Sequence, residues 1–134
     1  MYYKKCIIIV EGNVEVRRNL IEALIARDFD VFAYDKAERV LNASIISYVD
    51  AIIMSAQLPG INGWTAISLI RQHHPQIPVI LLSTCNDANY ITKPEIEVND
   101  YILVPFLMED LVARLKIVLE RFEMVHGIKS YLRN

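Results

Sequence analysis

The chain alternates between short runs of apolar residues and longer stretches in which apolar residues recur every three or four positions. The apolar runs have the length of strands and cover residues 5–10, 30–34, 51–54, 79–82 and 100–104. Most of them are apolar at consecutive positions, which is typical of parallel strands buried on both faces, whereas 30–34 alternates. All are far shorter than the roughly 18 apolar residues that cross a bilayer.

The stretches between these runs have the periodicity of amphipathic helices. They cover residues 14–27, about 35–46, 64–73 and 107–126. Asn13 is suited to cap the start of the first helix, and Asp35 and Glu38 have the spacing of a capping box at the start of the second. Gly127 is placed to end the last helix.

Five strands that alternate with helices predict an α/β fold. We expect a five-stranded parallel sheet, doubly wound in the flavodoxin-like order 2-1-3-4-5, in three layers αβα. The helix expected within residues 85–99 is short or distorted, because Pro94 costs about 3 kcal/mol in a helix interior. We expect one domain over residues 1–126, followed by a C-terminal tail or linker stub over 127–134.

Composition narrows the class of protein. The 134 residues are 54% hydrophobic, which favours one domain with a packed interior. A net charge of -2 offers no basic patch for nucleic acid or for a membrane surface. Two cysteines, Cys6 and Cys85, and an N-terminus without a signal-peptide layout are typical of a reduced, cytoplasmic protein.

Polar and turn-forming residues follow the third apolar run. Ser55 stands directly after it, and Pro59, Gly60 and Gly63 mark a tight loop that leads into the next helix. Both glycines can adopt a positive φ without steric cost. Because ligands of open parallel sheets bind at the carboxyl ends of strands, Ser55 is the first position at which to look for chemistry.

Asp50, four apolar residues, Ser55 and then Pro59, Gly60 and Gly63 form a pattern that resembles the centre of the response-regulator receiver domain. The resemblance extends over about residues 5–124 and implies a CheY-like domain of two-component, phosphorelay signal transduction. It places Ser55 where the family has the aspartate that accepts a phosphoryl group.

The resemblance assigns further positions of the same site. Glu11 and Gly12 stand where the family has two acidic residues that hold Mg²⁺. Ser83 matches the hydroxyl residue that contacts the phosphoryl group, and Tyr101 matches the aromatic switch residue of the fifth strand. Val104 stands where the family has a lysine before a proline.

Val104 is followed by Pro105, so the proline is present and the lysine is missing. Phosphoryl transfer to a side chain needs an anionic nucleophile, a divalent cation and a positive charge on the transferring group. Ser55 is neutral at pH 7, Glu11 alone is a weak candidate for Mg²⁺, and Val104 carries no charge.

These departures predict an atypical, degenerate pseudo-receiver that is not phosphorylated at the usual site, is not an enzyme, and has no catalytic residue, bound metal or cofactor. We expect it to act through protein–protein interaction. The resemblance places that partner surface, or a homodimer interface, on the fourth helix, the fifth strand and the last helix.

Two alternatives remain open from the sequence. The first is a response regulator that is phosphorylated on a non-standard acceptor. The second is a flavodoxin-like domain that binds a small ligand at the strand ends near Ser55 and Ser83, which requires a sizeable pocket not filled by Met54 or Leu58. A serine hydrolase is disfavoured, because the residues around Ser55 lack the G-x-S-x-G pattern.

Overall fold

The computed structural model describes residues 4–84 and 98–132, with side chains described up to residue 125. Five parallel strands form one sheet in the order β2-β1-β3-β4-β5, as expected. The strands are β1 (Cys6–Val10), β2 (Asp30–Tyr34), β3 (Ala51–Ser55), β4 (Val79–Ser83) and β5 (Asp100–Leu103). The helix expected within residues 85–99 lies almost entirely outside the described residues.

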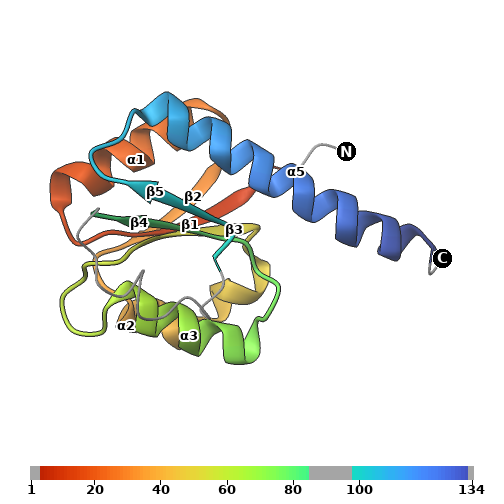
Figure 1. Ribbon diagram of the computed structural model, residues 1–134, viewed down its shortest axis with the longest axis horizontal. Coiled ribbons are helices and arrows are strands. Elements are labelled where there is room, and N and C mark those ends of the chain that lie inside the picture. The colour runs from red at the N-terminus through yellow and green to blue at the C-terminus, as the bar shows by residue number, and fades with distance from the viewer. Residues whose placement is uncertain (1–3, 85–97, 133–134) are drawn as a thin grey trace.

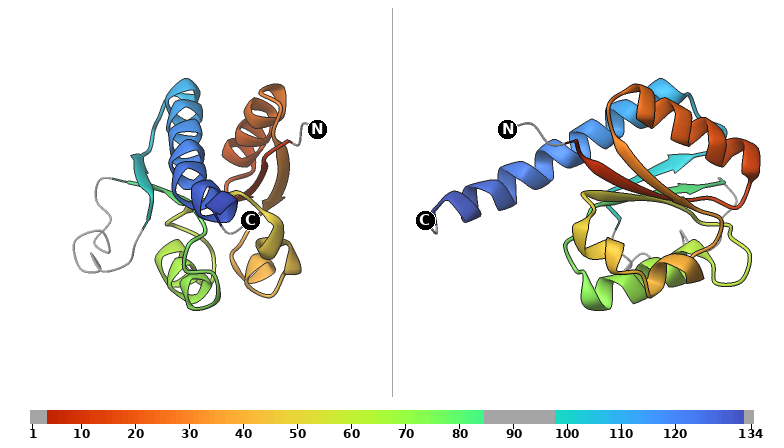
Figure 2. Two further views of the ribbon diagram at one scale, coloured as in Figure 1. Left: turned by 90° about the vertical axis from the view of Figure 1, so that its right-hand side faces the viewer. Right: turned by 180° about the vertical axis from the view of Figure 1, so that it is seen from behind.

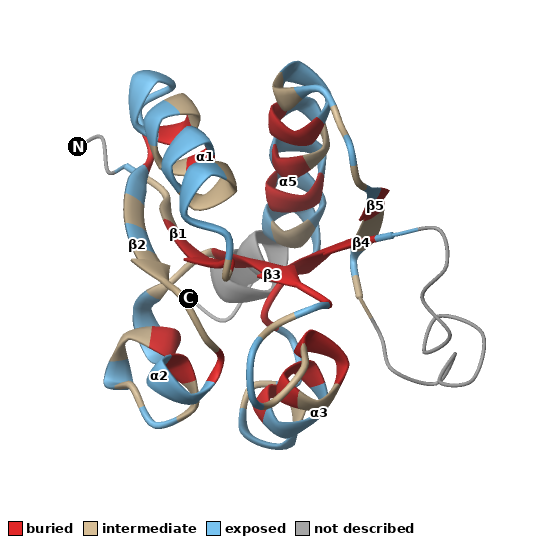
Figure 3. Cartoon of the chain, turned by 90° about the vertical axis from the view of Figure 1, so that its left-hand side faces the viewer, coloured by how far each residue is buried: buried red, intermediate tan, exposed pale blue. Residues whose placement is uncertain are grey.

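Helices cover both faces of the sheet and complete the three predicted layers (Figure 1). They are α1 (Val14–Ala26), α2 (Glu38–Leu41), the 3₁₀ helix η1 (Ser44–Tyr48), α3 (Gly63–His73) and α5 (Met108–Leu132). Helices α1 and α5 lie on one face, and α2 and α3 lie on the other (Figures 1 and 3).

The continuous apolar strands supply a separate core to each face. Ile7 and Ile9 of β1 pack toward α1 and α5, whereas Ile8 and Val10 pack toward α2 and α3. This alternation is the period-two geometry of a strand, and it explains why consecutive residues of β1 are all apolar. Figure 3 shows the buried sides of α3 and α5 facing the sheet.

Two asparagines begin the helices that adjoin the strand ends. The side chain of Asn13 accepts a hydrogen bond from the Val16 amide at 3.0 Å, which confirms the expected cap of α1. Asn62 accepts from the Thr65 amide at 2.9 Å and caps α3 in the same way. Each cap satisfies an amide that the first turn of a helix leaves without a partner.

The predicted second helix is wrong in its start and its length. Asp35 does not cap α2, because its carboxylate pairs with Arg39 at 2.8 Å. The Glu38 carboxylate instead accepts from the amide of Ile61, in the loop before α3, at 3.4 Å. The α-helix begins at Glu38 without a side-chain cap and ends at Leu41, and the separate 3₁₀ helix η1 follows it.

The predicted end of the last helix is also wrong. Helix α5 passes through Gly127 and continues to Leu132, and its C-terminal part projects away from the sheet (Figure 2). A glycine inside a helix costs only about 1 kcal/mol relative to alanine, so it ends a helix only where a capping structure follows. The division into a domain over 1–126 and a tail over 127–134 stays a prediction.

Candidate functional site

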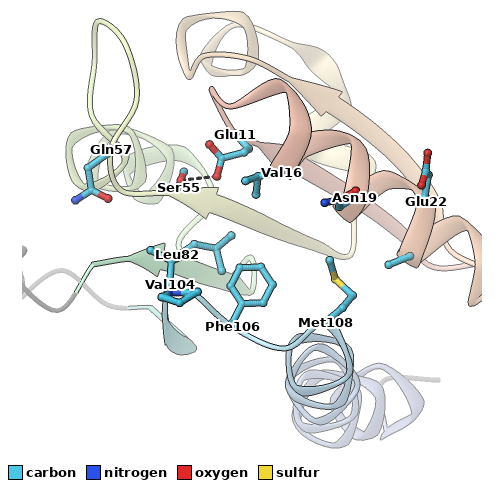
Figure 4. A pocket seen from close by; sticks show the side chains of 12 residues that line it. Glu11, Val16, Asn19, Glu22, Ser55, Gln57, Leu82, Val104, Phe106 and Met108 are labelled. Carbon is cyan, nitrogen blue, oxygen red and sulfur yellow. Dashed lines mark hydrogen bonds between the residues drawn. The ribbon is translucent and has the colours of Figure 1, made fainter.

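The sheet brings Glu11 and Ser55 together at its carboxyl edge. β1 and β3 are neighbours, paired from Ile7 with Ala51 to Val10 with Met54, so Glu11, which follows β1, lies beside Ser55, the last residue of β3. The Ser55 hydroxyl donates a hydrogen bond to Oε1 of Glu11 at 2.9 Å (Figure 4). Both residues are buried, with exposures of 7% and 8%.

The second carboxylate oxygen of Glu11 is also engaged. Oε2 accepts a hydrogen bond from the Asn13 amide at 3.0 Å, so the loop after β1 folds back over the carboxylate. The guanidinium of Arg17 lies nearby but donates to the backbone carbonyl of Glu11 at 2.8 Å rather than to its side chain. Glu11 is therefore held in place by neutral donors.

Gly12 is confined by its surroundings. A Cβ atom at this position would lie 3.2 Å from Cδ of Pro59, so a larger residue there requires the proline ring to shift slightly. Gly60 has a φ of +73°, a positive value that glycine can adopt without steric cost, as expected from the sequence. Gly63 does not need a positive φ; it is required because a Cβ atom would lie 2.1 Å from the carbonyl oxygen of Ser55.

Ser83 ends β4 and is fully buried. Nε2 of Gln57 lies 3.3 Å from the Ser83 hydroxyl oxygen and donates a hydrogen bond to it. Sequence reasoning missed Gln57. Its only signal was a polar side chain two residues beyond Ser55, in a loop that the turn residues already marked.

Tyr101 of β5 packs against the helix layer. Its ring stacks on Trp64 with the centroids 6.2 Å apart, and its hydroxyl donates to the carbonyl of Thr84 at 3.4 Å. The contact ties the first turn of α3 to the edge of the sheet. These contacts fit an ordinary strand aromatic and fit equally a switch residue whose ring packs against α3.

An open pocket of about 970 Å³ begins at Glu11 and Ser55 and extends between α1 and the connection from β5 to α5. Figure 4 shows Val104, Phe106 and Met108 on one side of it, opposite α1. Its walls are Glu11, Val16, Asn19, Glu22, Ala23, Ser55, Gln57, Leu82, Val104, Pro105, Phe106 and Met108. Of the positions singled out in the sequence, the pocket unites Glu11, Ser55, Val104 and Pro105.

Gly12, Ser83 and Tyr101 do not line this pocket. Neither Met54 nor Leu58 fills it, since both pack in the core on the α2–α3 side. The space that the small-ligand alternative requires is therefore present beside Ser55 but, among the described residues, not beside Ser83.

The donor set does not fit Mg²⁺. The resemblance implies a divalent ion held by carboxylates at this edge, but among the described residues it is Glu11 alone whose carboxylate contacts Ser55, a neutral hydroxyl. No cluster of three or more His, Cys, Asp or Glu side chains able to hold a metal occurs within the part of the chain that the structure describes.

Two groups with shifted pKa values lie at the opposite end of β1. The ammonium of Lys5 donates a hydrogen bond to the Glu123 carboxylate, and this contact raises the pKa of Lys5. Burial raises the pKa of the Cys6 thiol, and the nearby carboxylates of Asp50 and Asp30 raise it further. Neither group takes part in the pocket.

The raised pKa of Cys6 predicts slow alkylation. Because the folded pKa lies above the unfolded value, the stability contributed by the neutral thiol is complete below the unfolded pKa and is lost as the pH rises through the folded one. In a Cys85→Ser variant, iodoacetamide is expected to alkylate the folded protein with a midpoint at higher pH than the same variant in urea. Coincident midpoints would contradict this.

The comparison with protein families decides what kind of domain carries this site. The family model described as "Response regulator receiver domain" matches residues 7–116. The chain belongs to this family. It is a receiver domain of the two-component response regulators, and such domains are in general signalling modules rather than enzymes.

Relatives of this receiver domain include regulators of transcription. The regulatory protein VanR of Enterococcus faecium is 31% identical over 129 residues, which cover 96% of this chain and 55% of VanR. The transcriptional regulatory protein CusR of Escherichia coli K12 is 27% identical over 116 residues, or 86% of this chain and 51% of CusR. The receiver therefore spans about half the length of these curated relatives.

Solved structures agree with the fold of this receiver. The signal receiver domain of an HD domain-containing protein from Pseudomonas fluorescens Pf-5 superposes with a TM-score of 0.81 at 25% identity, covering 91% of this chain and 99% of the other.

Among the residues described here, no helix has the length and apolarity needed to cross a membrane.

Proposed function

We propose that this receiver domain is not phosphorylated at Ser55 and signals through contacts with a protein partner. The observation that carries the proposal is the hydrogen bond that the neutral hydroxyl of Ser55 donates to Glu11, at the place where the family has an anionic acceptor. The Ser55 hydroxyl keeps its proton and directs it at the Glu11 carboxylate. This carboxylate is itself held by the amide of Asn13.

Charge in the surrounding pocket supports the same conclusion. A transferring phosphoryl group needs positive charge to offset its negative oxygens. No Lys, Arg or His lines the pocket within the described residues, and Glu11 and Glu22 make it acidic. The carboxylates of Glu11 and Glu22 would repel an incoming phosphodonor, and Val104 supplies none of the attraction that the family's lysine provides.

The proposed partner surface lies on β5 and α5, together with the segment before β5 that lies outside the described residues. Leu103 on the edge strand β5 is 48% exposed, and Ile117 on α5 is 47% exposed. Apolar side chains on adjoining elements are suited to a partner contact, which includes a homodimer. Between the two elements, Arg114 pairs with Asp100 at 3.0 Å and holds α5 against the sheet edge.

Two-dimensional amide NMR tests whether the phosphorylation site binds Mg²⁺ or a mimic of the phosphoryl group. We titrate the protein first with Mg²⁺ and then with Mg²⁺ plus beryllofluoride, a mimic of the phosphoryl group. Because the donor set is incomplete, no saturable shift is expected at Glu11, Ser55 or Ser83. Saturable shifts there that spread to Tyr101 would overturn the proposal and favour a receiver that still responds to an anion.

A further inference from the structure

The pocket beside Ser55 extends well beyond the residues of the phosphorylation site. Its volume of about 970 Å³ is at the upper end of the range for small-molecule sites. Away from Ser55 the pocket is lined by apolar side chains, Ala23 of α1 and Phe106 and Met108 across from it, with Asn19 and Glu22 at its α1 rim (Figure 4). The other end holds the Glu11 carboxylate beside Ser55 (Figure 4).

The Glu11 carboxylate keeps capacity for another donor. A carboxylate offers about four lone-pair sites, and Ser55 and Asn13 occupy two of them. Among the described residues, no lysine or arginine forms an ion pair with this carboxylate. The nearest guanidinium, that of Arg17, points at backbone carbonyls instead.

Val104 widens the apolar wall. It lines the pocket and is half-buried, and with Pro105 and Phe106 it forms a continuous apolar surface from the end of β5 to the start of α5. A long cationic side chain at this position would point its charge toward the acidic end. With valine there, the acidic end is left for a cation from outside the chain.

We propose that this pocket binds a small amphiphilic amine. The apolar body lies between α1 and the connection from β5 to α5, and the ammonium group donates to Glu11. Charge complementarity selects a cation, since Glu11 and Glu22 are the charged groups among the lining residues and no basic side chain lines the pocket within the described part of the chain. Charge-assisted hydrogen bonds of this kind are about twice as strong as neutral ones.

Three probes that share the same apolar group but differ in charge separate the contribution of charge to binding from the contribution of shape. Phenylbutylamine, phenylbutanol and phenylbutyrate carry a cationic, a neutral and an anionic end, and each is titrated into the full chain with amide NMR as the readout. The amine is expected to give saturable shifts at Val16, Ala23 and Phe106 and to bind about tenfold or more tightly than phenylbutyrate. Equal binding of all three, or no saturation by the amine at roughly 10 mM, would overturn the proposal.

Two pairs of variants test the two ends of the pocket. Ala23→Phe fills the apolar end and is expected to abolish binding of the amine, whereas Ala26→Phe is a matched control on the same helix that does not line the pocket. Glu11→Gln removes the charge and is expected to abolish the preference for the amine over phenylbutanol. Glu15→Gln, on the exposed side of α1, is its control.

The result for each variant tests whether the amine binds in this pocket. Binding that survives Ala23→Phe, or a preference for the amine that survives Glu11→Gln, places the ligand elsewhere and overturns the proposal. The outcome is independent of the phosphorylation experiment, because an amine binds without a phosphoryl group, Mg²⁺ or the switch residues Ser83 and Tyr101.

Discussion

A Ser55→Asp variant incubated with acetyl phosphate and Mg²⁺ is expected to take up almost no phosphoryl group. The substitution restores the acceptor carboxylate but places it beside the Glu11 carboxylate, where a hydrogen bond of 2.9 Å now joins Ser55 and Glu11. Two like charges at this distance repel, and repulsion raises the pKa of one of them and weakens it as a nucleophile. The second metal-binding carboxylate and the lysine are still absent.

The triple variant Gly12→Asp/Ser55→Asp/Val104→Lys is expected to be labelled at least about a hundredfold more than Ser55→Asp alone. Loss of one group that stabilises developing charge typically costs about a hundredfold to a thousandfold in rate, so restoring the set together should recover more than any single change. The Gly12 substitution requires Pro59 to move, because a Cβ atom lies 3.2 Å from its ring. Intact-protein mass spectrometry measures the added phosphoryl group.

The matched control is Gly12→Asp/Val104→Lys, which keeps Ser55 and is expected to remain unlabelled. It has the restored metal ligand and the restored cation but no acceptor carboxylate. Efficient labelling of the unmodified protein, lost on Ser55→Ala, would show instead that the serine is an acceptor. Rapid labelling of Ser55→Asp alone would show that the other two departures do not impair the chemistry.

Replacing Gly63 with alanine is expected to reduce the free energy of unfolding by about 3 kcal/mol or more. The added Cβ atom would lie 2.1 Å from the Ser55 carbonyl oxygen and 2.9 Å from Cα of Ala56, and these are backbone atoms that cannot turn aside. Gly63 also donates its amide to the Ala56 carbonyl at 2.9 Å. The start of α3 is thereby fixed against the end of β3.

Helix propensity predicts the opposite sign for this substitution. Alanine is favoured over glycine by about 1 kcal/mol in a helix interior, so a helix free to move would be stabilised. Urea denaturation followed by circular dichroism separates the two expectations. Ser68→Ala, at an exposed position of the same helix, is the control and is expected to change the free energy by less than about 0.5 kcal/mol. A loss below about 1 kcal/mol for Gly63→Ala would mean that α3 shifts to accommodate the methyl group.

The sequence by itself determined the fold and the residues at the family's key positions. Consecutive apolar residues mark a strand buried on both faces, and a three-to-four-residue repeat marks a helix, because each signal reflects local backbone geometry. The strand positions and the cap at Asn13 follow from such signals, and the sheet order follows from the doubly wound topology that alternating strands and helices favour. The positions of Glu11, Ser55 and Val104 follow from their order along the chain.

Two local signals failed, each for a different reason. Asp35 and Glu38 have the spacing of a capping box, but Arg39 and the amide of Ile61 engage their carboxylates instead. Gly127 is typical of a helix end, yet α5 passes through it. In both places the local preference is worth only about 1 kcal/mol, so competing hydrogen bonds at α2 and continuation of the helix at Gly127 outweigh it.

Only the tertiary structure decided how the site is assembled. The hydrogen bond between Ser55 and Glu11 joins residues 44 positions apart, and it depends on β1 and β3 being neighbours in register. The pocket between α1 and the start of α5 depends on how far apart two helices pack on one face of the sheet. Spacing along a sequence does not encode that separation, because it is set by the side chains of the core beneath both helices.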